Sequence, residues 1–178
     1  MKDEHELQSY FIKRLQSYLA KKGKTLIGWD EILEGGADKN AVIEVWRGDA
    51  EAAKALANGN RVIMAGPFYF DTPLQNKTLK DVYQTDLLSL PQYRENRQLL
   101  LGAEAPLWTE RVTTVNAESK LYPRLQAFAE ITWTGKRGDL DEFKRRMAEH
   151  YRYLDALAVA YGPEDKAVAN YKISFDAA

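Results

Sequence analysis

The chain has 178 residues, a formal net charge of −1 at pH 7, 45% hydrophobic residues and no cysteine. This length suits one domain with a substantial core, and the near-zero charge gives no electrostatic reason to expect a nucleic acid or an acidic membrane surface as partner. The lack of cysteine excludes disulfides, thiolate nucleophiles and cysteine metal sites, and no apolar run approaches the ~18 residues of a membrane span.

The first expected element is an amphipathic helix from Glu4 to Lys22. Its apolar residues recur at helical spacing, and Gly23 ends it. No signal peptide precedes this helix, so we expect soluble, cytoplasmic material. The adjacent carboxylates Asp3 and Glu4 are expected to be a solvated helix start, and His5 and His150 to be surface residues.

Four short strands follow, alternating with helices. The strands are expected at Thr25–Trp29, Ala41–Trp46, Arg61–Ala65 and Leu99–Gly102, and the helices at Asp49–Ala57, about Thr78–Leu88, Tyr122–Trp133 and Asp139 to about Ala160. Asp49 is expected to cap the first of these helices. The apolar run at Leu99–Gly102 is typical of a strand buried on both faces. This order predicts a parallel α/β sheet with covering helices.

Aromatic and acidic residues gather where these strands end. The groups are Trp29-Asp30-Glu31, Trp46-Arg47, Tyr69-Phe70-Asp71 and Trp108-Thr109-Glu110, whereas Trp133 lies on a helix and is expected in the core. Since ligands bind at the carboxyl ends of parallel strands, the pattern predicts an aromatic-walled polar pocket for a carbohydrate or another small polar ligand. The alternative is purely structural, with buried tryptophans and helix-capping carboxylates.

Five segments, taken in order, resemble consecutive blocks of glycoside hydrolase family 20, the β-N-acetylhexosaminidases. They are LIGWDEILEGG, VIEVWRGD, VIMAGPFYFD, LLGAEAPLWTE and LYPRLQAFAEITWT. The resemblance runs from Lys2 to about Leu157. It implies the second half of a (β/α)8 TIM barrel, with the four strands corresponding to the fifth to eighth strands of the family barrel.

The resemblance also implies roles for six residues. Trp29, Trp46 and Trp108 match aromatic residues around the N-acetyl group and sugar ring, and Tyr69 matches the tyrosine that holds the acetamido oxygen. The carboxylates that match sugar-hydroxyl ligands are those of Asp71 and Glu110. The family mechanism is substrate-assisted retention, in which the 2-acetamido oxygen attacks the anomeric carbon. The reaction needs no cofactor, and no metal site is expected.

The acid/base pair of the family, an adjacent Asp-Glu that follows a His-x-Gly-Gly run, has no counterpart in this sequence. Substrate-assisted chemistry brings its nucleophile with the sugar, so one protonated acid against the glycosidic oxygen would suffice. Asp71 and Glu110 are therefore the candidate catalytic residues, if aromatic surroundings raise a pKa. Glu31 is expected to point away from the pocket or to bind a neighbouring loop.

The whole chain, 1–178, is expected to be a single half-barrel domain, with 164–178 an extended tail. Four barrel strands leave two open edges, so we expect a homodimer whose two half barrels complete one barrel. The expected ligand is an N-acetylhexosaminide oligosaccharide or aryl glycoside. Three interpretations stay open, namely an active hexosaminidase, an inactive sugar-binding module and a fragment of a longer enzyme.

Overall fold

The computed structural model describes residues 3–89 and 91–165; the expected tail at 164–178 lies almost wholly outside this part of the chain. Its strands are β1 (Ile27–Trp29), β2 (Val42–Val45), β3 (Arg61–Met64) and β4 (Leu100–Ala103). Its helices are α1 (Glu4–Lys21), α2 (Asp49–Ala57), α3 (Leu79–Tyr83), α4 (Pro91–Glu95), α5 (Ala117–Leu121), α6 (Arg124–Thr134) and α7 (Leu140–Ala156). The predicted α/β alternation is confirmed, and the short helices α4 and α5 are additions to it.

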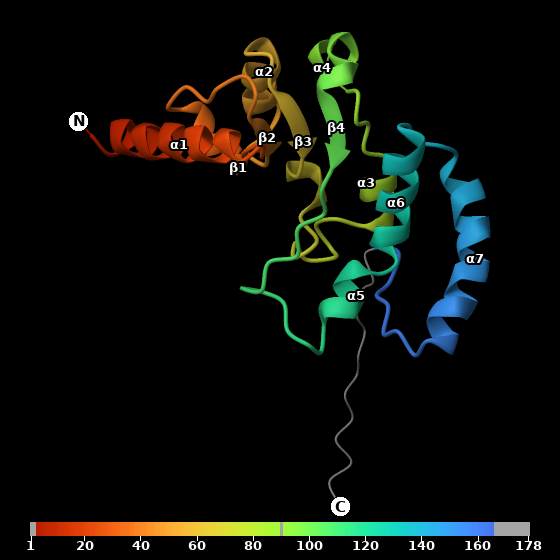
Figure 1. The fold of residues 1–178 in the computed structure, drawn as a ribbon. Coiled ribbons are helices and arrows are strands. Elements are labelled where there is room, and N and C mark those ends of the chain that lie inside the picture. Colours follow the sequence, from red (N-terminus) through yellow and green to blue (C-terminus); the bar gives the residue numbers. More distant parts are fainter. Residues whose placement is uncertain (1–2, 90, 166–178) are drawn as a thin grey trace, which may run out of the picture.

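All four strands are parallel and lie in the order β1-β2-β3-β4 (Figure 1). Val45 of β2 pairs with Met64 of β3, and Met64 pairs with Ala103 of β4. The carboxyl ends of the strands are therefore in line, and the segments that follow them leave the sheet along one edge. The predicted parallel sheet with covering helices is confirmed.

A β-bulge changes the register between β3 and β4. Val62 pairs with Leu100, but the next residue, Ile63, pairs with Gly102, so Leu101 is an extra residue on β4. Gly102 has φ +146°, a backbone angle that residues with a Cβ atom rarely adopt. Leu101 is 51% exposed, so the expectation of a strand buried on both faces is wrong. β4 is an edge strand, and a sequence pattern does not reveal which strand lies at an edge.

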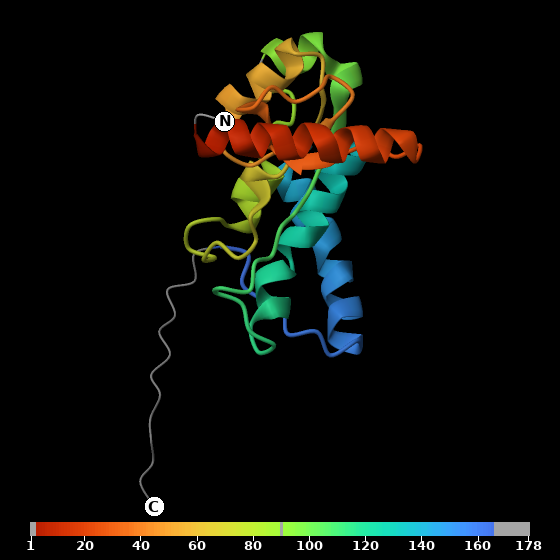
Figure 2. The ribbon, with the colours of Figure 1, turned by 60° about the vertical axis from the view of Figure 1, so that its left-hand side comes forward.

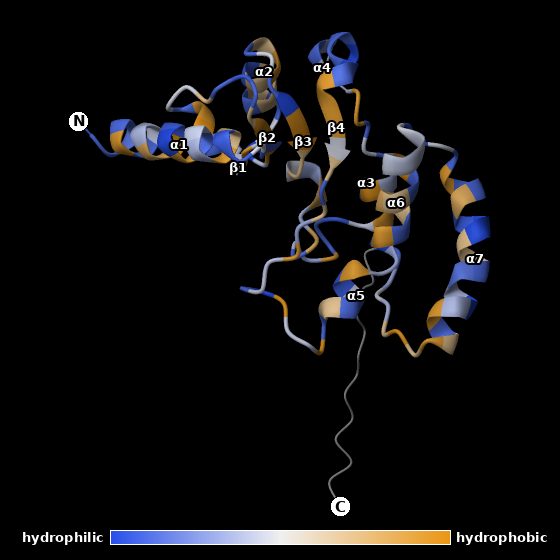
Figure 3. Cartoon of the chain, in the orientation of Figure 1, coloured by the Kyte–Doolittle hydropathy of each residue, from blue (hydrophilic) through white to orange (hydrophobic). Residues whose placement is uncertain are grey.

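The main core lies between the sheet and the helices α2, α3 and α6. Ile43 and Val45 of β2 and Val62 and Met64 of β3 are buried in this core. In Figure 3, β3 and β4 are largely hydrophobic, whereas hydrophilic and hydrophobic segments alternate along α7. Tyr83 of α3 stacks on Phe143 of α7 with ring centroids 4.3 Å apart, which joins α7 to this core.

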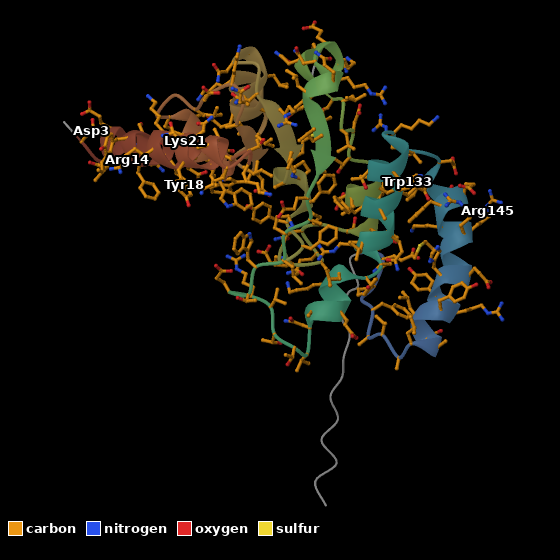
Figure 4. The ribbon with its side chains drawn as sticks, viewed as in Figure 1. Asp3, Arg14, Tyr18, Lys21, Trp133 and Arg145 are labelled. Carbon is orange, nitrogen blue, oxygen red and sulfur yellow. The ribbon has the colours of Figure 1, made fainter. Side chains whose placement is uncertain are left out.

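Helix α1 begins where the sequence predicted, because the Asp3 carboxylate accepts a hydrogen bond from Glu6 N at 2.8 Å. Its predicted apolar face is only partly covered: Leu15 and Leu19 pack against the core, but no residue of α1 is fully buried. Leu7, Phe11 and Tyr18 are each more than half exposed. In Figure 2 the helix crosses in front of the sheet, and in Figure 4 Tyr18 lies along its lower side.

Two smaller expectations were wrong. Trp133 is 92% exposed on α6 (Figure 4), because the inward side of that helix is formed by Ala127 and Ile131 instead. Asp49 is the first residue of α2 rather than its cap, which is Gly48 at φ 115°. None of the described helices is both long and apolar enough to span a membrane.

Candidate functional site

An open cleft of about 500 Å³ lies at the carboxyl ends of the strands. It is lined by Trp29, Glu31, Trp46, Tyr69, Asp71, Trp108, Glu110 and Arg111. Each of the four strands contributes to it through the segment at its carboxyl end, as the parallel arrangement requires. All six residues that the resemblance assigned to the sugar pocket are among these eight.

Two aromatic pairs form the walls of the cleft. The rings of Trp29 and Trp108 have centroids 6.1 Å apart at an interplanar angle of 44°, and those of Trp46 and Tyr69 lie 6.4 Å apart at the same angle. Trp46 is 41% exposed and Trp108 45% exposed. Exposed indole faces around a polar floor suit a ring-shaped ligand with one apolar face and hydroxyl groups at its rim.

Asp30 and Glu31 hold the end of β2 in two different ways. The buried Asp30 carboxylate accepts from the backbone nitrogens of Trp46 and Arg47, both at 3.0 Å, and from the Arg47 side chain. Glu31 instead accepts from the Trp46 indole nitrogen, which lies 3.0 and 3.2 Å from its two carboxylate oxygens. Asp30 therefore fixes the backbone at the end of β2, and Glu31 orients the indole ring of Trp46.

Of the two alternatives expected for Glu31, pointing away from the pocket is wrong, because Glu31 lines the cleft. Binding to a neighbouring loop agrees with its hydrogen bonds from Trp46, which directly follows β2. Asp30 and Glu31 lie in a short 3-10 helix, Asp30–Leu33. In that conformation consecutive side chains do not alternate between two faces as they do in a strand. The sequence had suggested a strand running straight into a loop, and this turn could not be read from it.

Arg47 connects this network to the start of the chain. Its Nη1 lies 2.5 Å from Glu34 Oε1, and Glu34 Oε2 lies 3.5 Å from His5 Nδ1 on α1. The hydrogen bond to Arg47 holds the pKa of Glu34 below its usual value, and the same contact raises the pKa of Arg47. Arg47 is thus a permanent cation behind the cleft wall.

Tyr69 keeps its phenolic proton at neutral pH. Burial raises its pKa above the ordinary value, an interaction with Trp108 lowers it, and the negative charges of Asp71, Glu31 and Asp30 raise it further. A protonated phenol that lines the cleft is a hydrogen-bond donor for a ligand oxygen. This arrangement is what an amide or hydroxyl oxygen of a ligand requires.

The two candidate catalytic carboxylates lie in the same cleft but in different surroundings. Asp71 is partly buried, and its Oδ1 is inaccessible to solvent without a hydrogen-bond partner among the described residues. Glu110 is exposed. A buried acceptor without a partner is rare. Asp71 nevertheless lines the cleft, so the carboxylate oxygen open to a ligand hydroxyl is Oδ2 rather than Oδ1.

The sequence reasoning missed Arg111, the one cation lining the cleft. It follows Glu110 directly, and its position in the same strand-end loop was the signal that could have identified it. Among residues 3–89 and 91–165, no three His, Asp or Glu side chains are grouped so as to hold a metal ion. The side chains that line the cleft supply carboxylates, a phenol, indoles and a guanidinium.

The fold and the cleft define a parallel α/β-barrel protein with an aromatic-walled polar site. The family model for the catalytic domain of glycosyl hydrolase family 20 matches residues 1–136. The chain belongs to this family, which confirms the resemblance.

Known relatives agree with this assignment. The β-hexosaminidase of Porphyromonas gingivalis is 38% identical over 177 residues, which cover 90% of this chain and 23% of that protein. The crystal structure of a β-N-acetylhexosaminidase from Bacteroides fragilis matches with a TM-score of 0.80 and 30% identity, covering 97% of this chain and 40% of that one. A variant of Streptomyces plicatus β-hexosaminidase, solved in complex with product N-acetylglucosamine, matches with a TM-score of 0.71 and 26% identity, covering 89% and 36%.

The chain thus spans only about a quarter to a third of the curated relatives that it matches. The fold and family are shared with these proteins. Activity and substrate for this chain are considered next.

Proposed function

We propose that the cleft binds a terminal β-linked N-acetylhexosamine, N-acetylglucosamine or N-acetylgalactosamine, as the recognition part of a glycoside hydrolase site. The observation that carries this proposal is the convergence of Trp29, Trp46, Trp108, Tyr69 and two carboxylates in one cleft. The N-acetylglucosamine bound to the Streptomyces plicatus relative is consistent with the same ligand class.

Each group has a function in this proposal. The indoles cover the apolar face of the sugar and the N-acetyl methyl, and the Tyr69 hydroxyl donates to the acetamido oxygen. Asp71 and Glu110 accept hydrogen bonds from sugar hydroxyls, and charge-assisted hydrogen bonds of this type are among the strong ones. Glu31 keeps Trp46 in place without needing to touch the sugar.

We further propose that the reaction is hydrolysis with retention, in which the 2-acetamido oxygen of the substrate attacks the anomeric carbon. The C–O bond to the leaving group breaks as the new C–O bond to the acetamido oxygen forms, and the leaving oxygen takes a proton from a carboxylic acid. Water then opens the oxazolinium ion and returns that proton to the carboxylate. Asp71 and Glu110 are the carboxylic acids proposed for this step.

One observation favours the second candidate function, sugar binding without turnover. None of the three adjacent Asp-Glu pairs, Asp3-Glu4, Asp30-Glu31 and Asp141-Glu142, follows a His-x-Gly-Gly run. Asp3 caps α1, the Asp30 carboxylate is bound to Trp46 and Arg47, and Asp141 and Glu142 lie in the first turn of α7. Of these six acids, Glu31 alone lines the cleft, where it binds the Trp46 indole. The acid/base of the chain, if it has one, is therefore a strand-end carboxylate.

The deciding experiment combines turnover with binding. Release of p-nitrophenol from its N-acetyl-β-glucosaminide is measured for the wild type, Asp71→Asn and Glu110→Gln, with N-acetylglucosamine binding followed by tryptophan fluorescence. Turnover that one substitution abolishes identifies the acid. Saturable binding without turnover establishes the sugar-binding function, and the absence of binding overturns the proposal.

The open edges of the sheet lead to a proposal about assembly. Ile27 on β1 and Leu101 on β4 are each about half exposed at the two edges. We propose that a second copy of the chain covers these edges, so that two half barrels share one mouth. Sedimentation at micromolar concentration would show a dimer, and a stable monomer on dilution would refute it.

A further inference from the structure

The segment that carries Asp71 is held mainly through its backbone carbonyls, by two cations from α5 and α6. This segment, residues 70–77, is called the Asp71 loop below. Four of its backbone carbonyl oxygens accept hydrogen bonds from Lys120 or Arg124, namely those of Phe70, Asp71, Thr72 and Lys77. No carboxylate takes part in these bonds, which is unusual for buried cations.

Arg124 is the centre of this arrangement. It is fully buried, and its guanidinium carbon lies 4.7 Å from the centre of the Phe70 ring. Its Nη2 donates to Phe70 O at 2.5 Å, and its Nη1 to Lys77 O at 3.1 Å and Thr72 O at 3.4 Å. Burial lowers its pKa to about 10 and the Asp71 charge opposes this shift, so Arg124 remains a cation at neutral pH.

Lys120 completes the arrangement at Asp71 itself. Its Nζ donates to the backbone carbonyl of Asp71 at 2.7 Å. The Nε of Arg124 in turn donates to Lys120 O at 3.0 Å, so Arg124 also holds the backbone of Lys120 in place. The backbone on both sides of Asp71 is thus fixed, while Oδ1 of its side chain has no partner among the described residues.

We propose that Lys120 and Arg124 are positioning residues for Asp71: they fix the Asp71 loop by its carbonyls so that the Asp71 carboxylate is held ready for a sugar hydroxyl. This proposal rests on the proposed sugar-binding function. The two cations act on Asp71 through its backbone. Their charge-assisted hydrogen bonds offset the free-energy cost of burying a carboxylate oxygen without a hydrogen-bond partner.

The test is a double-mutant cycle with Lys120→Met and Asp71→Asn, measured by two readouts. One is the dissociation constant for N-acetylglucosamine, and the other is the urea midpoint of unfolding. We expect Lys120→Met to weaken binding roughly tenfold. In the Asp71→Asn background it should have little further effect, because the group that it positions is gone. The change in urea midpoint should be the same in both backgrounds.

Two controls separate positioning from general damage. Lys144→Met removes a lysine that binds Glu164 and Asp165 far along the chain, and it should leave the affinity unchanged. Arg124→Lys keeps the charge but not the planar fork, and it should weaken binding more than Lys120→Met does. Equal losses of affinity from Lys120→Met in both backgrounds, or no loss in the wild type, would overturn the proposal.

A third readout does not depend on sugar binding. Amide hydrogen exchange within the Asp71 loop reports its order directly, because Thr72 N donates to Tyr69 O and Asn76 N to Pro73 O. Lys120→Met should speed exchange there and leave α7 unchanged. If the wild type fails to bind N-acetylglucosamine, the proposed function fails, and unchanged exchange in the Asp71 loop would separately refute the positioning role.

Discussion

The indole nitrogen of Trp46 lies 3.0 and 3.2 Å from the two carboxylate oxygens of Glu31, so an acid at the end of β1 orients a ring at the end of β2. Both residues line the cleft. The contact ties two strand ends together at the point where the sugar ring is proposed to lie. It also accounts for a carboxylate in the cleft that need not touch the ligand.

The first prediction concerns this contact. Glu31→Ala frees the Trp46 ring and should weaken N-acetylglucosamine binding by about three- to tenfold, while changing the unfolding free energy by less than about 1 kcal/mol, because the contact is exposed. Glu31→Gln keeps one acceptor oxygen and should lose less of the affinity for N-acetylglucosamine. Fluorescence titration and urea unfolding measure the two quantities. Equal losses for Ala and Gln would argue against an orienting role.

The second prediction concerns Asp30, which is fully buried and accepts three hydrogen bonds. Asp30→Ala leaves two backbone donors and a cation without their acceptor and should cost about 3 kcal/mol of unfolding free energy. Glu34→Gln removes the exposed partner of the same arginine and should cost less than about 1 kcal/mol. Urea denaturation compares the two variants, and similar costs would contradict the assignment.

The third prediction concerns the close approach of β3 to β2 beneath the cleft. A Cβ on Gly66 would lie 2.7 Å from the backbone oxygen of Trp46, which cannot move without moving the ring. Gly66→Ala should therefore cost about 1–3 kcal/mol and weaken sugar binding as well. Gly28→Ala is the matched control, because its nearest atom, at 2.9 Å, is the tip of the Ile32 side chain. In calorimetry, Gly28→Ala should lower the melting temperature less than Gly66→Ala does.

The fourth prediction is a pH dependence of stability from Glu130. Hydrogen bonds from Arg146, at 2.6 and 2.8 Å, hold its pKa below the ordinary 4.5, and burial opposes this shift. A carboxyl whose pKa is lowered by folding contributes stability above its unfolded pKa and loses it as pH falls through the folded value. The free energy of unfolding should thus decline below about pH 4.5, and that of the Glu130→Gln variant should decline less steeply. Parallel slopes for the two proteins would refute this.

The fifth prediction concerns Trp133, which is 92% exposed. Trp133→Phe should change the unfolding free energy by no more than about 0.5 kcal/mol. The variant should also lose the most quenchable part of the emission, leaving the three tryptophans of the cleft as reporters of sugar binding. Acrylamide quenching and urea unfolding check both points. A large loss of stability would contradict the prediction, because it would mean that Trp133 makes a stabilising contact despite its exposure.

The sequence predicted the four strand ends and six of the eight residues that line the cleft, because strand periodicity and the rule for parallel sheets act locally. It did not predict which surfaces are covered. The apolar face of α1 was correctly predicted as apolar, yet Leu7 and Phe11 are exposed while Leu15 and Leu19 pack partly buried against the core. Periodicity states that a face is apolar, and only tertiary contacts decide what packs on it.

The supports of the cleft were harder to predict than its walls. Arg124 looks like an ordinary basic residue near a helix start, yet it is fully buried against backbone carbonyls 47 to 54 positions away in the sequence. Glu31 lies next to Asp30, yet the two acids bind different parts of Trp46. Such contacts depend on turn geometry and long-range packing, which leave no periodic signal.

The strands occupy the sheet in the order in which they are synthesised, β1-β2-β3-β4. Each strand therefore exchanges backbone hydrogen bonds only with its immediate predecessor and successor. Dividing such a sheet between two strands breaks one ladder and leaves every other ladder intact. A run of consecutive strands therefore keeps its own ladders when it is separated from the rest of such a sheet, and the ligand groups at its strand ends keep their neighbours.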